Sequence, residues 1–388
     1  MKEDWKECII GDICSKITSG GTPKSSNTSF YGGSIPWLNT KEVNFNRIYS
    51  TEKTISQVGY DNSSAKWIPK NSVIVAMYGA TAGRVAISKI ELTTNQACCN
   101  LIIDSNKADY NFIYYHLCNS YLHLSSLANG GAQQNLNANQ IREYPINLPS
   151  LPTQQKIATI LSSLDDKIEL NNKINDNLEQ QAQAIYDELF NNDDRNIILG
   201  DIIETTSGGT PSRKNMAFYT NGNYCWVKSK ELQSSFIIDT EEKITDDAIN
   251  NSAAKLLPKN SVLIAMYGAT VGAYGIISKD MTCNQAICAL LPNENYPYSY
   301  LFMFAKNITH ELENLAVGSA QQNISQILIK KLKVHSDTNK IKEFHSYTHS
   351  LFEKKLLIEQ ENKNLSNLRD TLLPKLMSGE IEMDEVMV

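Results

Sequence analysis

Apolar residues recur alternately four and three positions apart in two long stretches of the chain. The first stripe consists of Ile157, Leu161, Leu164, Ile168, Leu178, Ala182, Ile185 and Leu189, with the polar residues Asn171 and Asn175 at its middle. The second consists of Ile341, Phe344, Leu351, Ile358, Leu365, Leu368 and Leu372, interrupted by Lys355 and Asn362. A 3.5-residue period is typical of a coiled-coil seam. The pattern predicts two long helices, over 151–191 and 336–377.

Each stripe requires a partner, and the two helices are each other's obvious partners. The polar residues midway along both seams favour a role in setting the register. The alternative is that each helix lies on its own domain. We expect the first helix to begin near Pro152 and Thr153, with Thr153 as a cap, and Ser336 or Asp337 to cap the second. Pro374 should bend or end the second helix.

The remaining two segments, 1–150 and 192–335, carry short β-rich runs punctuated by Gly and Asn. Examples are the runs at 72–77 and 261–266, which read SVIVAM and SVLIAM. Such runs are typical of compact α+β domains. We therefore expect an α+β protein with two globular domains (1–150 and 192–335), two long helices and a C-terminal tail, 378–388.

The whole organisation is a tandem repeat. Ser19-Gly-Gly-Thr-Pro23 returns as Ser207-Gly-Gly-Thr-Pro211, an offset of 188 residues. Residues 69–83 read PKNSVIVAMYGATAG and residues 258–272 read PKNSVLIAMYGATVG, with twelve of fifteen positions identical. Asn-Gln-Ala at 95–97 and Ala-Gln-Gln-Asn at 132–135 also return, at 284–286 and 320–323. Landmarks in the same order at offsets of 188–189 residues indicate duplication, and hence a pseudo-two-fold internal repeat.

Charge and cysteine content bear on which partners and which cell compartment the chain can have. The chain has 36 basic and 42 acidic residues, a net charge of −6, but residues 1–150 hold 13 basic and 11 acidic residues. The acidity lies in the predicted helices, so the two domains can each present a local basic face. None of the eight cysteines forms a Cys-x-x-Cys pair, which favours reduced, buried thiols. With no apolar run of 18 residues and no signal peptide, we expect a cytoplasmic protein without a membrane partner.

Searches for catalytic motifs are negative. The chain contains no phosphate-binding G-x-x-x-x-G-K-[ST] loop, no H-E-x-x-H pair, no G-x-S-x-G elbow and no motif for base methylation. His345 and His349 lie four apart on the second helix, where a metal clip is conceivable and a solvated or seam-flanking pair is favoured. We expect no catalytic residues, no metal site and no cofactor bound by this chain.

The two copies differ most in one stretch. Residues 24–66 align with residues 212–255 at only a few points, such as Trp37 with Trp226 and Lys41-Glu42 with Lys230-Glu231. Residues common to both copies should serve the core or a partner that docks twice, whereas diverged residues should face something different in each copy. The pattern therefore favours a tandem reader of two unlike DNA half-sites.

The residue types in and beside these stretches suit DNA. Glycine-rich turns let backbone amides approach phosphates, lysine and arginine neutralise phosphates or reach guanine edges, and glutamine and asparagine pair with adenine edges. The candidate DNA-binding residues are Thr22, Lys24, Ser25, Lys41, Tyr78, Thr81, Arg84, Gln133, Gln134 and Asn135 in the first copy, and Thr210, Ser212, Arg213, Lys214, Lys228, Lys230, Tyr267, Thr270, Gln321, Gln322 and Asn323 in the second.

Structural alternatives remain open at three of these features. The glycines can equally serve as tight turns between strands. Because the glutamines and asparagines are repeated, backbone positioning or fold maintenance is favoured for them over base reading. For Trp37 and Trp226, core packing is favoured over stacking on a base.

The order of these motifs resembles that of the specificity subunits of type I restriction–modification enzymes. The shared pattern is Ser-Gly-Gly-Thr-Pro, a variable stretch, Tyr-Gly-Ala-Thr-x-Gly, Asn-Gln-Ala, Gln-Gln-Asn and a heptad helix, given twice. The end of the second helix, LRDTLLPKLMSGEI at 368–381, and the entry to the first, LPTQQK at 151–156, fit the resemblance. The second helix departs from it, because its entry reads VHSDTN at 334–339.

The resemblance implies that each domain is a target-recognition domain reading half of a bipartite sequence in double-stranded DNA. It also implies that the helices pack antiparallel, set the spacer and dock two modification subunits, which are adenine methyltransferases. S-adenosylmethionine, ATP and Mg²⁺ would then be bound by the modification subunits and by restriction/translocase subunits. The alternative is a decoy that occupies methyltransferase partners and binds no DNA.

Overall fold

The computed structural model describes residues 5–128, 135–191, 194–316 and 323–381. Its contacts divide the chain into two compact units, Met1–Asp166 with Leu365–Val388, and Lys167–Asn364. Each unit combines one globular domain with parts of both long helices, α6 (Leu151–Phe190) and α12 (Thr338–Met377). The domain boundaries expected at 150/151, 191/192, 335/336 and 377/378 stay a prediction.

A five-stranded sheet forms the centre of the first domain, in the order β2-β10-β7-β8-β4. The bounds are β2 Cys14–Ser19, β10 Cys98–Ile103, β7 Val73–Ala76, β8 Val85–Ser88 and β4 Asn46–Ile48. All neighbours are antiparallel except β4 and β8, which are parallel. A four-stranded sheet, β5-β3-β9-β6, consists of β5 Lys53–Ile55, β3 Tyr31–Leu38, β9 Leu92–Thr94 and β6 Trp67–Ile68. β1 (Lys6–Ile9) pairs with β11 (Pro145–Leu148).

The second domain repeats this arrangement. Its five-stranded sheet has the order β13-β20-β17-β18-β15, with bounds β13 Thr205–Ser207, β20 Ile287–Leu290, β17 Val262–Ala265, β18 Tyr274–Ile277 and β15 Phe236–Ile237. β15 is again parallel to its neighbour β18. A three-stranded sheet consists of β16 Lys243–Ile244, β14 Tyr224–Val227 and β19 Thr282–Cys283, and β12 (Ile197–Ile198) pairs with β21 (Lys333–Val334).

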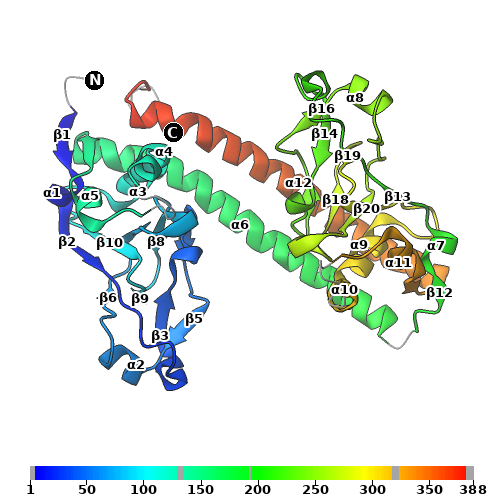
Figure 1. Ribbon diagram of the computed structural model, residues 1–388, viewed down its shortest axis with the longest axis horizontal. Helices are drawn as coiled ribbons and strands as arrows, with labels where there is room; N and C mark the ends of the chain where they lie inside the picture. The colour runs from blue at the N-terminus through cyan, green and yellow to red at the C-terminus, as the bar shows by residue number, and fades with distance from the viewer. Residues whose placement is uncertain (1–4, 129–134, 192–193, 317–322, 382–388) are drawn as a thin grey trace. The chain divides into compact units, whose positions relative to one another are not determined.

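Helices cover one face of each five-stranded sheet (Figure 1). In the first domain α3 (Tyr110–Asn119) packs on β7 and β8, and in the second α9 (Tyr298–Asn307) packs on β17 and β18. The runs VIVA and VLIA are apolar at every position because both faces of β7 and β17 are buried. The shorter helices are α1 Ile10–Ile13, α2 Gln57–Asp61, α4 Tyr121–Ser126, α5 Ala138–Arg142, α7 Leu199–Ile202, α8 Asp246–Asn250, α10 Thr309–Ala316 and α11 Gln326–Lys331.

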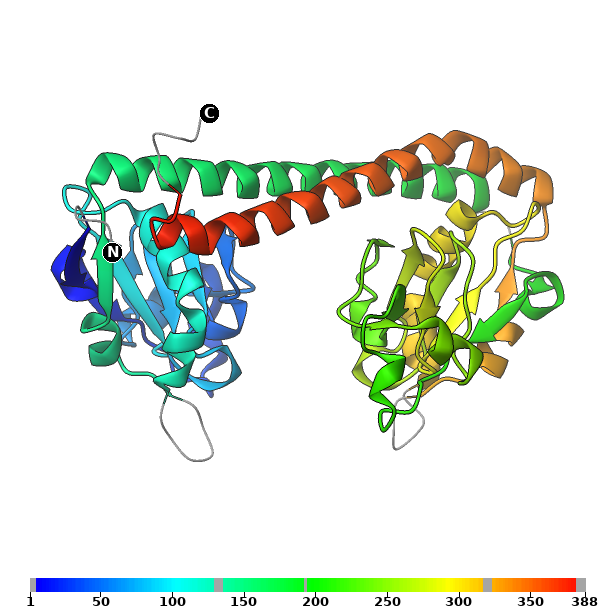
Figure 2. The same ribbon diagram turned by 90° about the horizontal axis from the view of Figure 1, so that it is seen from above.

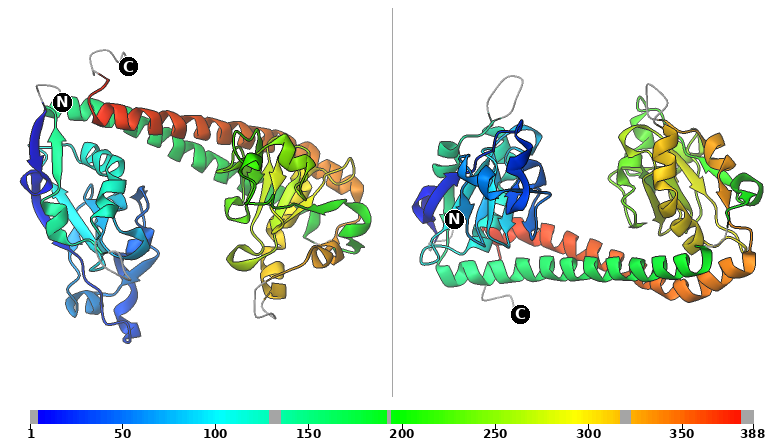
Figure 3. Two further views of the ribbon diagram at one scale, coloured as in Figure 1. Left: turned by 45° about the horizontal axis from the view of Figure 1, so that its top comes forward. Right: turned by 90° about the horizontal axis from the view of Figure 1, so that it is seen from below.

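The two long helices lie side by side and antiparallel in each unit (Figures 2 and 3). In the second unit, Asn171 Nδ2 donates to Asn362 Oδ1 at 2.9 Å, and further along, Asn175 Nδ2 donates to Glu359 Oε1 at 3.0 Å. In the first unit, Arg369 Nη1 lies 2.7 Å from Asp165 Oδ1. The helices thus pair with each other, as favoured from the sequence.

Each helix also packs on a globular domain. Ile157 and Leu161 belong to the core of the first domain, and Ile341 and Phe344 belong to the core of the second. The alternative arrangement, in which each helix lies on its own domain, is therefore also present. A single helix contacts its domain and its partner helix along different faces.

The predicted seam is more deeply buried at some positions than at others. Ile157, Leu161, Ile341, Phe344 and Ile358 are buried, whereas Leu164, Ile168, Leu178, Ile185, Leu189, Leu351 and Leu365 are half-buried. Leu368, placed in the second stripe from its spacing, is 48% exposed. That assignment was wrong because the following turn packs through Leu372 and Leu373 instead.

Three expectations about helix ends are resolved. Ser150 rather than Thr153 caps α6, because Ser150 Oγ accepts from the Thr153 amide at 3.4 Å. Asp337 caps α12 by accepting from the amides of Asn339 and Lys340 at 3.0 and 3.2 Å. Pro374 does not end α12, which continues to Met377.

Candidate DNA interface

The repeated motifs converge on one surface of the first domain. At the end of β7, the Met77 amide donates to the Ala97 carbonyl at 2.8 Å, and the Leu136 amide donates to the Met77 carbonyl at 2.7 Å. The Thr22 hydroxyl donates to the Gln96 side chain, and Tyr78 pairs with Asn135 in an isolated β-bridge. Motifs separated by up to about 110 residues in sequence therefore meet at one place.

The second domain repeats these contacts. The Met266 amide donates to the Ala286 carbonyl at 2.8 Å, and the Ile324 amide donates to the Met266 carbonyl at 2.9 Å. The Thr210 hydroxyl donates to the Gln285 side chain, and Tyr267 forms a bridge with Asn323. We call each set the repeat surface: Thr22, Tyr78, Gly79, Gln96 and Asn135 in the first copy, and Thr210, Tyr267, Gly268, Gln285 and Asn323 in the second.

An exposed turn lies at the centre of each repeat surface. Tyr78 is 44% exposed and Tyr267 is 42% exposed. Gly79 and Gly268 follow them with φ of +70° and +67°, a conformation that glycine adopts without strain. A Cβ at either glycine would meet nothing within 4 Å, so the backbone there is open to an approaching ligand. Thr81 and Thr270 close the turn by donating to the carbonyls of Tyr78 and Tyr267.

The Ser-Gly-Gly-Thr-Pro glycines have a different role. A Cβ at Gly20 would lie 2.0 Å from the Thr94 carbonyl oxygen, and one at Gly21 would lie 2.3 Å from the Ser64 carbonyl carbon. Gly208 and Gly209 meet the backbone of the second copy equally closely. These four glycines permit close packing of backbone on backbone, whereas Gly79, Gly83, Gly268 and Gly272 adopt positive φ in the turns between β7 and β8 and between β17 and β18.

Both tryptophans of the variable stretch belong to the core, as favoured from the sequence. Trp37 and Trp226 are buried, and their indole Nε1 atoms donate to the carbonyls of Gly21 and Gly209 at 2.9 and 3.0 Å. Each indole therefore fastens the variable stretch to the glycine motif, and its ring is not available for stacking on a base.

Cations of the second variable stretch are held by two glutamates. Arg213 forms a bidentate pair with Glu242 at 2.5 and 3.2 Å, and its guanidinium lies over the rings of Tyr219 and Trp226. Lys228 contacts Glu241 and Glu242 at 2.8 and 2.9 Å, and Lys230 contacts Glu241 at 2.7 Å. The Arg213 hydrogen bond lowers the pKa of Glu242 to about 2.

The first variable stretch presents its cations differently. Lys24 and Ser25 are exposed, as are Ser212 and Lys214 in the second copy. Lys41 pairs with Glu52 at 3.3 Å, and Arg84 donates from Nη1 to Asn44 Oδ1 at 2.8 Å. The two copies thus surround a common repeat surface with unlike charge arrangements. Gln133, Gln134, Gln321 and Gln322 lie outside the described residues.

Sequence reasoning missed four residues of this region. Gln96 and Gln285 were noted as repeat landmarks but not as surface residues, although each accepts the threonine hydroxyl and is exposed. The available signal was that both glutamines recur in the Asn-Gln-Ala motif. The alanine of that motif, Ala97 or Ala286, accepts a hydrogen bond from the methionine before the exposed turn. Glu241 and Glu242 carried no signal, because their partners lie 11–29 residues away.

Other chemistry is limited within the described part of the chain. No group of three or more His, Cys, Asp or Glu side chains that could hold a metal occurs there, and no helix there is long and apolar enough to cross a membrane. His345 and His349 accept or donate hydrogen bonds with Ser299 and Tyr298 at 2.8 and 2.9 Å. Burial raises the pKa of Cys99, Cys283 and Cys288 to about 12, so these thiols stay protonated at neutral pH.

The comparisons with known proteins agree with this geometry. A family model described as the type I restriction modification DNA specificity domain matches residues 2–180 and 194–336, one match for each copy of the repeat surface. The chain is therefore a protein with two DNA specificity domains.

Relatives of full length extend the match to the whole chain. It is 27% identical over 418 residues to the MjaIX specificity subunit of Methanocaldococcus jannaschii, covering 100% of this chain and 95% of that protein. It is 24% identical over 467 residues to the HindI specificity subunit of Haemophilus influenzae, covering 97% and 100%. The fold is similar to the crystal structure of the type I restriction–modification S subunit from M. genitalium, with a TM-score of 0.60, 18% identity and 97% of both chains covered. The chain belongs to the family of specificity subunits of type I restriction–modification enzymes.

Proposed function

We propose that this chain reads an asymmetric, bipartite DNA sequence, one half-site per domain, and docks modification and restriction subunits that carry out the chemistry. The observation that carries this proposal is that each domain presents the same repeat surface beside an unlike variable stretch. The repeat surface, which both domains share, can bind groups common to both half-sites, such as phosphates. The variable stretches, which differ between the domains, can contact different base pairs.

The geometry supports a division of roles within each domain. The open turn after Tyr78 and Tyr267 exposes backbone beside amide side chains, which are groups that bind phosphate oxygens. Lys24, Ser25, Ser212 and Lys214 are exposed, follow Thr22 or Thr210 of the repeat surface closely in sequence, and are proposed to reach base edges or phosphates. Arg213, Lys228 and Lys230 reach DNA only by leaving Glu241 or Glu242, so we propose that they exchange carboxylate for phosphate on binding.

The chain itself is proposed to be non-catalytic and cytoplasmic. S-adenosylmethionine, ATP and Mg²⁺ belong to the partner subunits in this proposal, and the antiparallel helices provide the docking surface and set the distance between half-sites. A net charge of −6 fits a reader whose affinity for DNA depends on such partners.

Adenine-methylation mapping in cells tests the proposal. Cells that express this chain with its natural methyltransferase partner should gain methylation at a split motif with two unlike halves and a fixed gap, compared with cells that lack the chain. Exchange of residues 24–66 for those of another family member should change one half-site and keep the other. Unchanged methylation by an assembled complex would contradict the proposal and favour a decoy that occupies methyltransferase partners.

A further inference from the structure

The two domains are attached to the helices by contacts of opposite chemical character. We call the contacts between each domain and the two long helices its junction. In the first unit the junction joins Arg47 and Tyr115 of the domain to α6, where Asp165 also binds Arg369 of α12. In the second unit it joins Phe236 to α12 and Lys306 to α6. Each junction lies within one compact unit.

The internal repeat shows which positions of the two junctions correspond. Arg47 in β4 is paired with Ile87, and Phe236 in β15 is paired with Ile276, and these isoleucines are equivalent at the repeat offset of 189. Arg47 and Phe236 therefore occupy the same place on the edge strand. Helices α3 and α9 have 10 residues each and α6 and α12 have 40 each, so their residues align one to one. This alignment matches Tyr115 with Met303, Asp165 with Phe352, and Arg369 with Ala182.

The first junction is ionic at these positions. Asp165 accepts from Arg369 Nη1 at 2.7 Å and from the Tyr115 hydroxyl at 2.5 Å. Arg47 forms an ion pair with Asp166 and donates to the Ser162 carbonyl at 3.3 Å. The Arg47 side chain is only 6% exposed, so its charge depends on these partners rather than on water.

The second junction is apolar at the positions that align with Arg47, Tyr115, Asp165 and Arg369. The Phe352 ring lies 6.4 Å from the Phe236 ring and 5.4 Å from the Phe302 ring, centroid to centroid. Ala182 and Met303 are buried beside them. A guanidinium at the position of Phe236 would meet these rings, and the carboxylate of Asp165 is replaced by Phe352 at the aligned position. Glu353, which aligns with Asp166, is half-buried and accepts from the Tyr298 hydroxyl at 3.4 Å, so a guanidinium there would have to compete for it.

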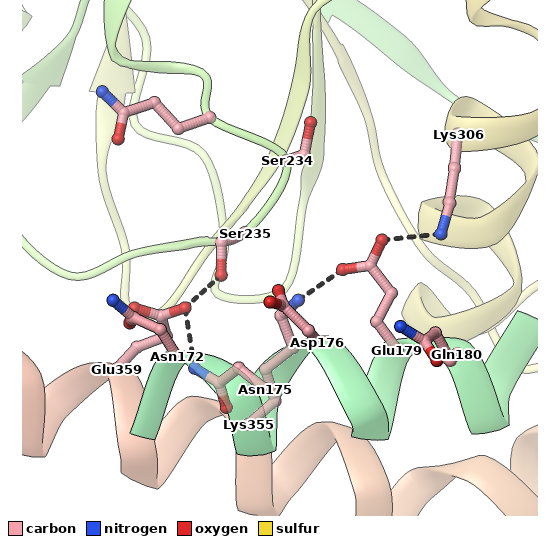
Figure 4. Close-up of a pocket in the computed structure, with 11 residues that line it drawn as sticks. Asn172, Asn175, Asp176, Glu179, Gln180, Ser234, Ser235, Lys306, Lys355 and Glu359 are labelled. Atoms are coloured by element: carbon pink, nitrogen blue, oxygen red, sulfur yellow. Dashed lines mark hydrogen bonds and ion pairs between the residues drawn. The ribbon is translucent and has the colours of Figure 1, made fainter. Parts of the chain in front are cut away.

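The ion pairs of the second junction lie at other positions. Glu179 contacts Lys306 at 2.7 Å and Lys355 at 2.5 Å, and Glu359 accepts from Ser235 and Asn175 (Figure 4). These groups border a polar cavity of about 420 Å³. The aligned positions in the first unit are Ser366 for Glu179, Cys118 for Lys306 and Ile168 for Lys355, so this network has no counterpart there.

We propose that the unlike junctions assign each recognition domain to its own segment of the helix pair. Arg47, Tyr115, Asp165 and Arg369 are then positioning residues, as are Phe236, Phe352, Glu179 and Lys355. Without this difference, a duplicated chain would offer each domain two similar docking places. The inference rests on the proposed function only where it concerns DNA, because the match between domain and helix is a property of the free protein.

A two-by-two set of full-length chains tests this assignment. The place of the first domain, residues 1–150, is occupied either by that domain or by a copy of the second domain, 192–335. The helix segment beside it is either unchanged or converted to the second type by Asp165→Phe, Ile168→Lys, Ser366→Glu and Arg369→Ala. Matched chains are those in which the domain and the helix segment come from the same junction.

We expect a crossover in thermal stability. Each mismatched chain should melt at least about 5 °C below the matched chain with the same domain. Conversion of the helix should therefore destabilise the parent domain and stabilise the transplanted one. Equal effects of the conversion on both domains, or a matched transplant that does not fold, would overturn the inference.

Methylation by the assembled complex gives a second readout. The matched transplant should methylate a split palindrome built from one repeated half-site, at least about 10-fold more than the mismatched transplant. Equal methylation by both transplants would overturn the inference. Absence of methylation by the parent complex, with the stability crossover retained, would overturn the proposed function and leave the junction assignment intact.

Discussion

Glu242 determines which cations of the second variable stretch are available at its surface. It binds Arg213 and Lys228 together, so two candidate DNA contacts share one carboxylate. The arginine also lies on the faces of Tyr219 and Trp226, which holds the guanidinium in one place. With Lys230 and Glu241, the cluster sets two carboxylates against three cations, so most of the basic charge that the composition indicated is neutralised.

Removal of this carboxylate should have a pH-dependent effect on stability. The pKa of Glu242 is lowered from 4.5 to about 2, chiefly by the Arg213 hydrogen bond. Its contribution is therefore complete above pH 4.5 and is lost as the pH falls toward 2. We expect Glu242→Gln to melt about 2 °C below the parent between pH 5 and 8, with the difference vanishing near pH 2.

Thermal unfolding of both proteins across this pH range provides the measurement. Glu204→Gln, at an exposed glutamate of the same domain, serves as the matched control and should show no such trend. A difference between Glu242→Gln and parent that persists unchanged to pH 2 would contradict the assigned role of the carboxylate.

Residue-level prediction succeeded where local sequence carried the cause. Trp37 and Trp226 were assigned to the core because an aligned tryptophan in a stretch that otherwise diverges indicates a common structural role. The pairing of Lys228 with Glu241 was not predictable, because it depends on how the chain folds between residues 13 positions apart. The DNA-binding role of the named side chains stays a prediction.

At the scale of elements, we expect polar residues in the helix seam to set which turns of α6 and α12 face each other. Asn171 Nδ2 donates to Asn362 Oδ1 at 2.9 Å and to Glu361 Oε2 at 2.8 Å, and Asn362 Nδ2 donates to Asn172 Oδ1 at 2.9 Å. Asn171 and Asn362 are both buried. A shifted register would leave these amides without partners, which is the physical basis for their selectivity.

Leucine at positions 171 and 362 should raise the thermal stability of the chain and weaken the selection of one helix register. The double variant Asn171→Leu/Asn362→Leu should melt higher than the parent, because two buried amides are replaced by apolar side chains. Asn362→Leu alone should melt lower by an amount equivalent to about 1–2 kcal/mol, because Asn171 keeps an amide beside an apolar neighbour.

Disulfide formation between Asn175→Cys and Glu359→Cys reports the native register, since these side chains are in contact in the parent. Its yield should fall in the double leucine background and remain high with Asn171 and Asn362 intact. An unchanged yield in both backgrounds would show that these asparagines do not select the register.

The extents of both helices were predictable, because the expected bounds 151–191 and 336–377 lie within two residues of the observed ones, whereas the continuation of α12 through Pro374 was not. The 3.5-residue spacing identified both 40-residue helices because a buried face must repeat along their length. Pro374 was expected to bend or end α12, yet the helix continues through it to Met377. Proline removes one backbone hydrogen bond inside the helix, but Leu376 and Met377 of the following turn are buried in the core of the first domain, which holds that turn in place. The turn then closes at Gly379, with φ of +71°.

At the scale of the whole molecule, the two units are connected through both helices at 166/167 and 364/365. Insertion of one heptad in each helix at these points preserves the 3.5-residue pattern and adds about 10 Å to each helix. If the helices set the spacer, the methylated motif should keep both half-sites and gain about three base pairs between them, at 3.4 Å per base pair. A chain with an equal insertion in the C-terminal tail is the control, and altered half-sites would contradict this role.

The architecture was largely predictable from the sequence because the chain is a duplication. A motif that occurs twice identifies equivalent positions, and this equivalence indicated the strands, the domain number and the shared surface together. What the duplication hides is the difference between the copies, such as Arg47 against Phe236, because these positions carry no repeated motif. Their meaning became apparent only when strand register and helix alignment placed them in corresponding junctions.

The position of the nearly identical tract at 69–83 and 258–272 bears on how such chains can evolve. A genetic crossover between the two copies through this tract would transfer the variable stretch that precedes the tract, Arg47 included. Tyr115 and Asp165, which follow the tract, would stay behind. Recombinants formed this way would carry a new variable stretch whose edge strand does not match the helix segment beside it. We therefore expect selection to retain recombinants that exchange whole domains together with their helix segments.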